Sequence, residues 1–301
     1  MNLRLQPRDL NALICTYRHG FLLRDDLHAL AFPGKTRRLM TRRIKLLVDA
    51  GFMEGDVLPL GAFPVGLRGL LPHPGQFAYR VTENGARPVA ESIEADIALV
   101  RRRIHAVPSY VGHAVAVAKI AVALHRCASD QGYQVKEFLC ESDARYRYQW
   151  KPAGGDSRKV AGDWKTEELR PDGLAMLHWC GQLAAVHLEA DMATQGKVAL
   201  QAKLQAYALY VSTGALRRRF PDCQGLHLGI VTTSQQRVQT IRSVVADLNA
   251  PQLAQVRITT FAQLLGEGPH APIWSSPDSA LSPSSTLNPS STLKGLLSCS
   301  V

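Results

Sequence analysis

Apolar residues in the first part of the chain recur at helical spacing three times before the pattern changes. The first predicted helix has its apolar side chains at i, i+3, i+4 and i+7, on Leu10, Leu13, Ile14 and Tyr17. Gly20 ends this helix, a short helix follows over about residues 24–31, and a third spans about residues 36–50. Residues 57–65 and 76–81 then predict a hairpin around a long turn rich in Gly and Pro.

The third predicted helix carries an apolar stripe on one side and a basic face on the other. The apolar stripe consists of Met40, Ile44, Leu47 and Val48. The basic face, which Arg43 flanks, consists of Lys35, Arg37, Arg38, Thr41, Arg42 and Lys45. In the major groove of DNA, Arg38, Thr41 or Arg42 would reach base edges while the other cations bind phosphates. A solvated basic face without a partner is the alternative interpretation.

Two helices, a basic helix and a hairpin follow one another in the order of a winged helix-turn-helix domain, predicted here over residues 1–91. Double-stranded DNA is its expected partner. Residues 92–108 are predicted to form a helical connector with a narrow apolar stripe, made of Ile93, Ile97, Val100 and Ile104. This stripe suggests that the connector docks on the second domain or on a second copy of the chain, which would form a homodimer. A simple linker is the alternative.

Strands and helices mix in the second predicted domain, residues 109–266. Strands are expected over residues 134–140, 144–150, 174–177, 183–188, 226–232 and 256–260. Helices are expected over residues 110–126, 195–211 and 236–248, and a polar Gly-rich loop over residues 151–168. Pro and Ser dominate residues 267–301 without periodicity, so a disordered tail is expected there. The fold class is therefore α/β, with a mixed sheet in the second domain.

Composition narrows the class of partner and the compartment. The 301 residues have a formal net charge of +10, which favours a polyanionic partner. The six cysteines form no CxxC pair, so reduced thiols are expected rather than disulfides or zinc. The charged N-terminus does not resemble a signal peptide, and the longest apolar run, residues 111–124, contains His113 and Lys119. A cytoplasmic protein without a membrane segment is expected.

Three carboxylates lie at the ends of the two central predicted strands. Asp172 opens one strand, while Glu189 and Asp191 end the next and, being two residues apart, point to the same side. Carboxylates that cluster repel one another, and a hard divalent cation such as Mg²⁺, or Mn²⁺ as a substitute, would relieve that repulsion. The sequence therefore predicts a metal site with Asp172 and Glu189 as ligands and with Asp191 as either a third ligand or a group that orients water. Tyr207 and Tyr210, on the apolar helix that follows, are interpreted as core residues.

The order of elements and the placing of these acids resemble the restriction-endonuclease-like core with its PD…(D/E)xK pattern. Pro171-Asp172 matches the first half, and Glu189-Ala190-Asp191 stands where (D/E)xK is expected. More narrowly, residues 7–250 resemble the replication-relaxation family of bacterial plasmids and integrative elements, in FAYRVTENG, RPDG, HLEAD, KLQAYALY and LGIVTTSQQRVQTI. The resemblance implies a winged helix joined to a nuclease-like domain that acts on mobile-element DNA.

The chain departs from that pattern at one position. Asp191 replaces the lysine that would orient the attacking water, and Lys203 on the following helix is the expected substitute. With Asp172, Glu189, Asp191 and Lys203 as catalytic residues, the chain would be a metal-dependent DNA nuclease or nicking accessory. Two alternatives stay open. One is a non-catalytic DNA-binding regulator with a degenerate nuclease domain, and the other is a factor that recruits DNA to a relaxase or a replication initiator.

Overall fold

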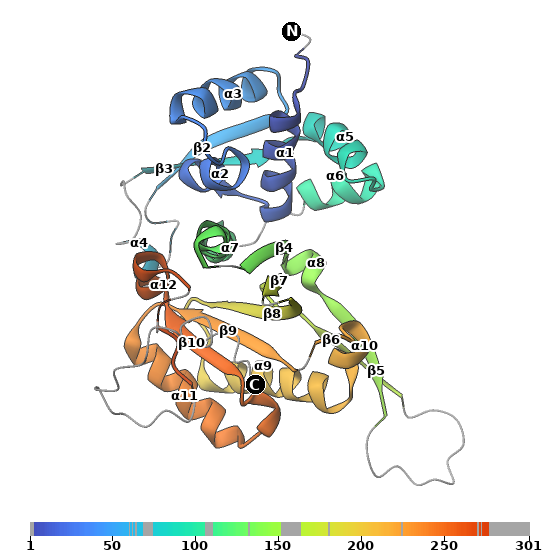
Figure 1. Ribbon diagram of the computed structural model, residues 1–301, viewed down its shortest axis with the longest axis vertical. Helices are drawn as coiled ribbons and strands as arrows, with labels where there is room; N and C mark the ends of the chain where they lie inside the picture. The colour runs from blue at the N-terminus through green and yellow to red at the C-terminus, as the bar shows by residue number, and fades with distance from the viewer. Residues whose placement is uncertain are drawn as a thin grey trace. The chain divides into compact units, whose positions relative to one another are not determined.

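The computed structural model describes residues 3–59, 61, 63, 65–68, 75–105, 111–131, 133–151, 164–179, 181–223, 225–269, 271 and 273–276. The chain divides into two compact units, Met1–Arg126 and Cys127–Val301, which are drawn in Figure 1. Each unit buries its own apolar residues, and each is a mixture of helices and strands. The α/β class predicted from the sequence is thereby confirmed.

Helices dominate unit 1. Its elements are α1 (Pro7–His19), β1 (Leu22–Leu23), α2 (Arg24–Ala31), α3 (Arg37–Asp49), β2 (Met53–Pro59), α4 (Val65–Arg68), β3 (Gly75–Val81), α5 (Glu83–Ser92) and α6 (Ile97–His105). The strands form an antiparallel sheet in the order β1-β3-β2. The helix boundaries agree with those expected from periodicity. The predicted hairpin begins earlier than expected, at Met53, and α4 lies within its long turn.

One core unites the apolar stripes of the first three helices with the sheet. Leu13, Leu27 and Ile44 are at most 1% exposed and pack with Tyr79 and Val81 of β3. Burying such stripes is the main source of stability for short helices. The basic face of α3 lies on the opposite side of that helix, so packing of Met40, Ile44 and Leu47 decides which of its side chains are exposed.

The connector's apolar stripe belongs to this same core. Val100 of α6 is fully buried, and Ile93, Ile97 and Ile104 pack against the core of unit 1. The guanidinium of Arg103 lies 4.6 Å from the ring centre of Tyr17 in α1. The stripe was expected to dock on the second domain or a second copy. The stripe is instead packed in the core of unit 1, because α5 and α6 fold back as a helical pair.

The apolar run near the middle of the chain forms helix α7 (Val111–Gln131), which crosses the boundary between the two units. Over residues 111–128 it is long and apolar enough to cross a membrane by length and composition, yet 61% of that window is buried inside the protein. Lys119 in the same window forms an ion pair of 2.7 Å with Asp26, and both side chains are nearly buried. A buried charge pair and apolar neighbours are what a core helix of a globular protein shows.

Unit 2 is built on a mixed sheet. Its elements are β4 (Tyr133–Cys140), α8 (Glu141–Ala144), β5 (Tyr146–Trp150), β6 (Lys165–Leu169), β7 (Gly173–Trp179), β8 (Gln182–Asp191), α9 (Lys197–Ser212), α10 (Ala215–Arg219), β9 (His227–Thr232), α11 (Gln235–Leu248), η2 (Pro251–Leu253), β10 (Val256–Thr260) and α12 (Phe261–Glu267). Five strands lie in the order β10-β9-β8-β7-β4. The pairs among β8, β9 and β10 are parallel, and those among β4, β7 and β8 are antiparallel.

Helices α9 and α11 cover one face of this sheet, as Figure 1 shows. Leu204, Tyr207 and Tyr210 of α9 pack with Val238 and Ile241 of α11 and with the parallel strands. Each helix connects two parallel strands, which require such a crossover. The acid-bearing end of β8 consequently lies next to α9 and α11.

Two segments differ from the sequence prediction. Strand β6 lies inside the region expected to be a loop and pairs antiparallel with β5, from Tyr146↔Leu169 to Trp150↔Lys165. Its sequence, KTEEL, is charged and lacks an alternating apolar pattern, so only the partner strand shows that it is a strand. The expected disordered tail begins with structure: α12 reaches Glu267, and the backbone of Ser275 bonds to that of Ile258 in both directions. Residues 277–301 lie outside the described residues.

Candidate functional site

The register of β7 and β8 brings two of the predicted acids together. Gly173 pairs with Leu188, so Asp172, one residue earlier, lies beside Glu189. The backbone N–H of Ala190 donates to Oδ2 of Asp172 at 2.9 Å, which holds this carboxylate against β8. Asp172 is 9% and Glu189 4% exposed, so the pair is largely removed from water.

Gly173 permits the packing behind Asp172. A Cβ atom at this position would lie 2.8 Å from Cζ of Phe138, whose ring comes from the neighbouring strand β4. Any side chain at residue 173 would therefore displace that ring or the strand end that carries Asp172. In the sequence Asp172-Gly173, Asp172 supplies the acid, and Gly173 lets Phe138 of the adjacent strand approach closely.

Helix α9 contributes two side chains to the carboxylates from consecutive turns. Nζ of Lys203 contacts Oε2 of Glu189 and lies 3.7 Å from Oδ2 of Asp172. The hydroxyl of Tyr207 donates to Oε1 of Glu189. Residues four apart share a helix face, which is why both reach the same carboxyl group. We name Asp172, Glu189, Lys203 and Tyr207 the carboxylate–lysine cluster.

Burial and mutual charge set the protonation of this cluster. Burial, and then repulsion by Asp172, raise the pKa of Glu189 well above its usual value of 4.5, although Lys203 acts in the opposite direction. Burial alone would lower the pKa of Lys203, but Glu189 and Asp172 raise it to about 12. One ammonium faces two carboxyl groups, so its single positive charge does not balance both acids when they are ionised.

Asp191 points to the same side of β8 but has other partners. Nε and Nη2 of Arg237 donate to its two carboxylate oxygens at 2.8 and 2.9 Å, and the hydroxyl of Thr232 donates at 2.7 Å. Arg237 lies on α11, and its Nη2 also donates to the backbone oxygen of Gln195. A bidentate guanidinium–carboxylate pair of this kind occupies the oxygens that a metal would need.

The predicted set of three carboxylate ligands is therefore not assembled. Among the residues that the structure describes, no group of three or more His, Cys, Asp or Glu side chains could hold a metal ion. Asp172, Glu189 and Lys203 are brought together, while Asp191 is held by Arg237. The reason is Arg237, which lies on a helix much later in the chain. The spacing of residues along the strands could not predict this contact.

His187 adds a neutral ring beside this cluster. It precedes Glu189 by two residues on β8 and is fully buried, with ring centres 5.8 Å from Tyr207 and 5.7 Å from Tyr210. Burial, and next the positive charge of Arg219, lower the pKa of His187 to about 3. The imidazole is thus uncharged at neutral pH and packs as an aromatic group between β8 and α9.

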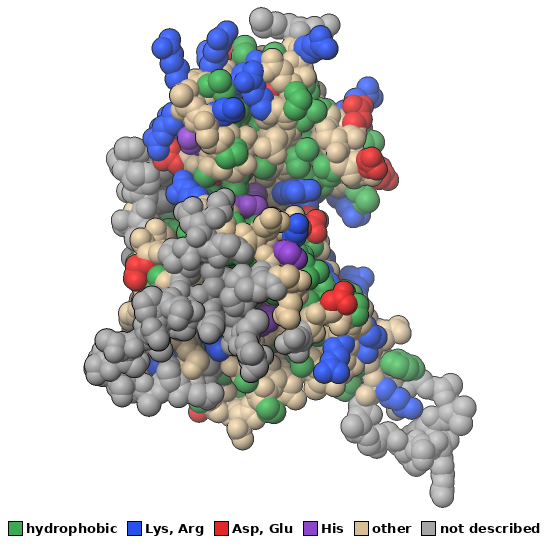
Figure 2. Space-filling model, in the orientation of Figure 1, with side chains coloured by type: hydrophobic (Ala, Val, Ile, Leu, Met, Phe, Trp, Pro, Cys, Tyr) green, Lys and Arg blue, Asp and Glu red, His purple; other side chains and the backbone are tan. Residues whose placement is uncertain are grey.

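The basic face predicted for α3 is exposed. Met40, Ile44 and Leu47 are buried, whereas Lys35, Arg37, Arg38, Thr41, Arg42 and Lys45 are all exposed. Figure 2 shows Lys and Arg side chains gathered over the part of unit 1 that carries α3. Arg37 lies 3.5 Å from Asp25 and Lys45 lies 2.9 Å from Asp49. Such exposed ion pairs are weak and leave these cations available to another anion.

Arg43 has a different role from its neighbours on α3. Its side chain is 13% exposed, and Nε donates to Oδ1 of Asp9 at 2.9 Å, while Nη2 bonds to Oδ2. Asp9 is fully buried in α1 and also accepts from the backbone N–H of Gln6. This ion pair ties α3 to α1, so Arg43 fixes the position of the basic face without being part of it.

Comparison with known families gives one match. The family model described as replication-relaxation matches residues 13–221, which is more than half of the chain. The chain belongs to the replication-relaxation family. The matched region runs from α1 to beyond α10 and contains both the basic face of α3 and the carboxylate–lysine cluster. No match was found among curated proteins or among solved structures.

Three residues of this replication-relaxation protein escaped the sequence analysis as functional groups. Tyr207 was interpreted as a core residue; it is buried as expected but also donates to Glu189. Its position one turn after Lys203 was the available signal. Arg43 and Arg237 each bind a carboxylate from a distant element, and nothing in their local sequence identifies that acid.

The carboxylate–lysine cluster has the donor set that a small hard cation takes in proteins. Mg²⁺ is usually held by one or two carboxylates, with water and substrate phosphate completing its coordination. Asp172 and Glu189 supply two adjacent carboxylates, and the exposed fraction of the Lys203 side chain, 31%, shows that the site reaches the surface there. The residues present therefore fit such an ion when Lys203 moves away from Glu189.

Proposed function

We propose that this protein is a DNA-binding, metal-dependent nuclease or nicking accessory of a plasmid or integrative mobile element. The observation that carries the proposal is the convergence of Asp172, Glu189 and Lys203 from two strands and a helix. Membership of the replication-relaxation family supports a role in the replication or relaxation of such DNA. Double-stranded DNA is the proposed substrate and Mg²⁺, replaceable by Mn²⁺, the proposed cofactor.

Unit 1 acts, in this proposal, as a winged helix with α3 as its recognition helix. The order α1, β1, α2, α3, β2, β3 and the antiparallel sheet support this assignment. Arg38, Thr41 and Arg42 would face base edges, while Lys35, Arg37 and Lys45 would bind phosphates. The hairpin of β2 and β3 would be the wing.

Unit 2 would supply a restriction-endonuclease-like core. The order β4, β7, β8, α9, β9 supports this, with β4, β7 and β8 antiparallel and β9 parallel to β8. Pro171-Asp172 would be the PD half of the motif and Glu189 its second acid. Lys203 would replace the lysine of the motif from the following helix, since Asp191 stands in the usual position.

The chemistry of the site follows from these residues. A divalent ion held by Asp172 and Glu189 would polarise the scissile phosphate and lower the pKa of an attacking water. Glu189 must first lose its proton, so the cluster would bind cations more tightly as the pH rises. Lys203, released from one carboxylate, would place its ammonium against the negative charge that develops on the phosphate. Tyr207 would keep Glu189 in position through its hydrogen bond.

A plasmid-nicking assay tests the catalytic part. Purified protein with supercoiled plasmid should produce nicked circles with Mg²⁺ or Mn²⁺ but not with EDTA. Asp172→Asn and Glu189→Gln should each slow nicking by roughly 100-fold, because a lost ligand removes several kcal/mol of transition-state stabilisation. Asp222→Asn is the matched control, since Asp222 is an exposed acid of the same unit, and it should nick like the parent.

The second candidate function is a non-catalytic DNA-binding regulator, or a recruitment factor for a relaxase or replication initiator. The position of Asp191 and its bond to Arg237 favour it, because the motif's lysine position is occupied by a structural ion pair. Specific DNA binding without nicking under any divalent cation, or equal nicking by Asp172→Asn and the parent, would establish this second function in place of the nuclease.

Duplex binding is tested on α3. The double variant Arg37→Ala, Lys45→Ala removes two exposed cations assigned to phosphates, so it should weaken binding and reduce the slope of log K against log salt by about 0.9 for each lost phosphate contact. A double variant with the same change in charge, Arg87→Ala with Arg102→Ala, removes exposed arginines from α5 and α6 instead. If both double variants lose equal affinity, net charge rather than α3 determines binding.

A further inference from the structure

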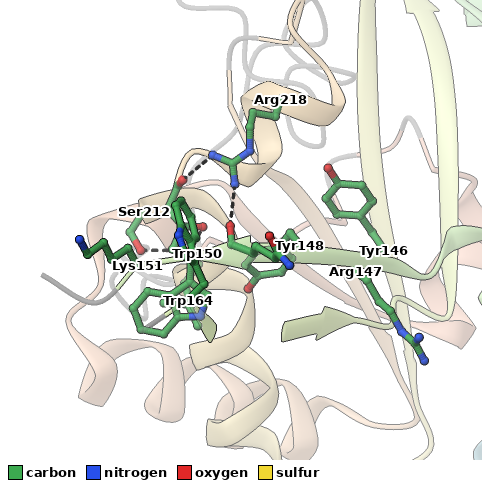
Figure 3. A pocket seen from close by; sticks show the side chains of 11 residues that line it. Tyr146, Arg147, Tyr148, Trp150, Lys151, Trp164, Ser212 and Arg218 are labelled. Atoms are coloured by element: carbon green, nitrogen blue, oxygen red, sulfur yellow. Dashed lines mark hydrogen bonds between the residues drawn. The ribbon is translucent and has the colours of Figure 1, made fainter. Parts of the chain in front are cut away.

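An open groove in unit 2 has no part in the proposed cleavage site. Its volume is about 760 Å³, and it lies between β5, the residue before β6, the C-terminal part of α9, and α10. Most of its large side chains, which Figure 3 shows, are aromatic or cationic: Tyr146, Arg147, Tyr148, Trp150, Lys151, Trp164 and Arg218. None of the described residues that line it is acidic.

The aromatic side of the groove is open to water. Trp164 is 61% exposed, although it is among the largest apolar side chains of the protein. Trp150 is half-buried at the same groove, with Nζ of Lys165 5.7 Å from its ring centre. Tyr148 is 5% exposed and is anchored by Tyr210 of α9, with ring centres 5.5 Å apart. An exposed indole beside an anchored aromatic floor is a surface on which a flat ring can stack.

Two of the cations that line the groove are held in place by hydrogen bonds. Arg218 donates to the backbone oxygens of Thr213 at 2.9 Å and Gln149 at 3.3 Å, which fixes its guanidinium at the groove (Figure 3). Arg147 is 72% exposed and bonds through Nε to Glu168. Lys151 is exposed next to Trp150 in the chain. The lining therefore presents positive charge beside aromatic rings.

Three contacts of arginine with an acid lie where β5 begins and β6 ends. Glu168 is the shared partner of three arginines, Arg145, Arg147 and Arg170. Their hydrogen bonds and charges lower the pKa of Glu168, with Arg147 as the first cause, so this carboxylate is ionised and is outnumbered by its cations. The chain then reaches Asp172 two residues after Arg170.

Helix α9 joins the groove to the carboxylate–lysine cluster. Ser212 lines the groove and Lys203 lies in the cluster, nine residues earlier on the same helix. At 1.5 Å per residue the two positions are about 14 Å apart along the axis. Nine residues are about two and a half turns of the helix, so the two side chains project from opposite sides of α9.

We propose that the groove binds unpaired bases of single-stranded DNA, with a base stacked on Trp164 and phosphates at Arg147, Lys151 and Arg218. Bases in a duplex are stacked on each other and do not offer a free face, so the groove discriminates in favour of single strands. This goes beyond the proposed nuclease and does not require cleavage.

The test is binding of a fluorescein-labelled oligo-dT in EDTA, followed by anisotropy, with a hairpin duplex measured in parallel. Trp164→Ala should bind the oligo-dT at least about fivefold more weakly, since stacking on an aromatic side chain contributes this much or more per base. Trp164→Phe, which keeps a ring, should retain most of the affinity. Leu183→Ala removes another exposed apolar side chain of the same unit and should have no effect.

Two charge variants test the phosphate contacts independently of stacking. Lys151→Ala should reduce the salt slope for oligo-dT by about 0.7, the value for one phosphate contact on a single strand. Glu167→Gln removes an exposed acid paired across the hairpin with Tyr148, and it should leave the affinity unchanged or raise it. A loss of affinity in Glu167→Gln would contradict a phosphate path along this hairpin.

The proposal that the groove binds single strands is wrong if Trp164→Ala binds oligo-dT like the parent. It is also wrong if this variant loses affinity for single strands and for the duplex equally. Failure of the proposed function has a different signature. Asp172→Asn would then nick like the parent, or neither would nick, while the effect of Trp164→Ala on oligo-dT persists. Conversely, if nicking depends on Asp172 and Trp164→Ala binds oligo-dT like the parent, the proposed nuclease stands and the proposed single-strand site is wrong.

Discussion

At the scale of single residues, the proton on Glu189 links the chemistry of the site to the stability of the fold. Asp172, Lys203 and Tyr207 all face this carboxyl group, and burial with the charge of Asp172 keeps its pKa raised. Folding therefore favours the protonated form of Glu189, while binding of a cation favours the ionised form. When Glu189 ionises, the folded protein becomes less stable and the site binds a cation more tightly.

The first prediction concerns pH. The folded-state pKa of Glu189 lies above the unfolded value of about 4.5, so the protonated acid contributes stability that is present below that pH and lost as the pH rises. The unfolding free energy of the parent minus that of Glu189→Gln should therefore fall as the pH rises above about 4.5. Urea unfolding of both proteins at each pH measures this. A difference that grows with pH would show instead that Glu189 is ionised and paired.

The second prediction isolates the tyrosine hydroxyl. Tyr207→Phe leaves a buried carboxyl oxygen without its donor, which should lower the unfolding free energy by about 1–3 kcal/mol. Tyr210→Phe removes a hydroxyl from the same helix and the same core, but not one bonded to Glu189, and should cost less. If both variants lose the same unfolding free energy in urea, the hydrogen bond to Glu189 does not stabilise the protein more than burial of a tyrosine hydroxyl does.

At the scale of elements, α3 shows how adjacent arginines take opposite roles. Thr36 begins the helix, with its hydroxyl accepting from the N–H of Leu39, and the buried stripe then orients every other side chain. Arg42 is exposed by that orientation, whereas Arg43 turns towards α1 and meets Asp9. Helical geometry separates neighbours by roughly 100° around the axis, so a surface cation and a buried one lie side by side in the sequence.

The third prediction follows from this contrast. Arg43→Met should destabilise unit 1 by about 3–5 kcal/mol, because it leaves the buried carboxylate of Asp9 without its cation. Arg42→Ala, an exposed change, should alter stability by less than about 0.5 kcal/mol while weakening duplex binding. Thermal unfolding and DNA titration of both variants decide the matter. A stable Arg43→Met variant would show that this ion pair is not needed to hold α3.

At the scale of the whole molecule, two units with separate cores share one chain. The core of unit 1 is built around α1, α3 and β3, and that of unit 2 around α9, α11 and the parallel strands. Units with their own cores are expected to unfold as separate cooperative transitions. The net charge of +10 acts across both and favours a polyanion at either binding surface proposed above.

The fourth prediction uses this division. Calorimetry should resolve two unfolding transitions, with Arg43→Met lowering the midpoint of one and Tyr207→Phe that of the other. The reason is that each substitution disturbs a contact inside a single unit. A single transition lowered by both variants would show instead that the two cores unfold together.

Local physics was sufficient for much of this architecture. Apolar spacing in α1, α3 and α11, the glycine stop after α1 and the apolar runs in β7 and β8 depend on near neighbours, so these elements could be predicted without any tertiary contact. The strand ends also placed Asp172 and Glu189 as neighbours, and the helix after them supplied Lys203. The basic face of α3 followed from the same periodicity.

Tertiary structure decided every feature that depends on a partner far away in the chain. Strand β6 has no apolar pattern of its own and exists through pairing with β5. The connector's stripe could have packed on several surfaces, and the core of unit 1 took it. Arg237 bound Asp191 and so removed it from the carboxylates beside Lys203. Sequence spacing states which way a side chain points, but only the fold states which group it meets, because charge pairs and packing join residues that no local pattern connects.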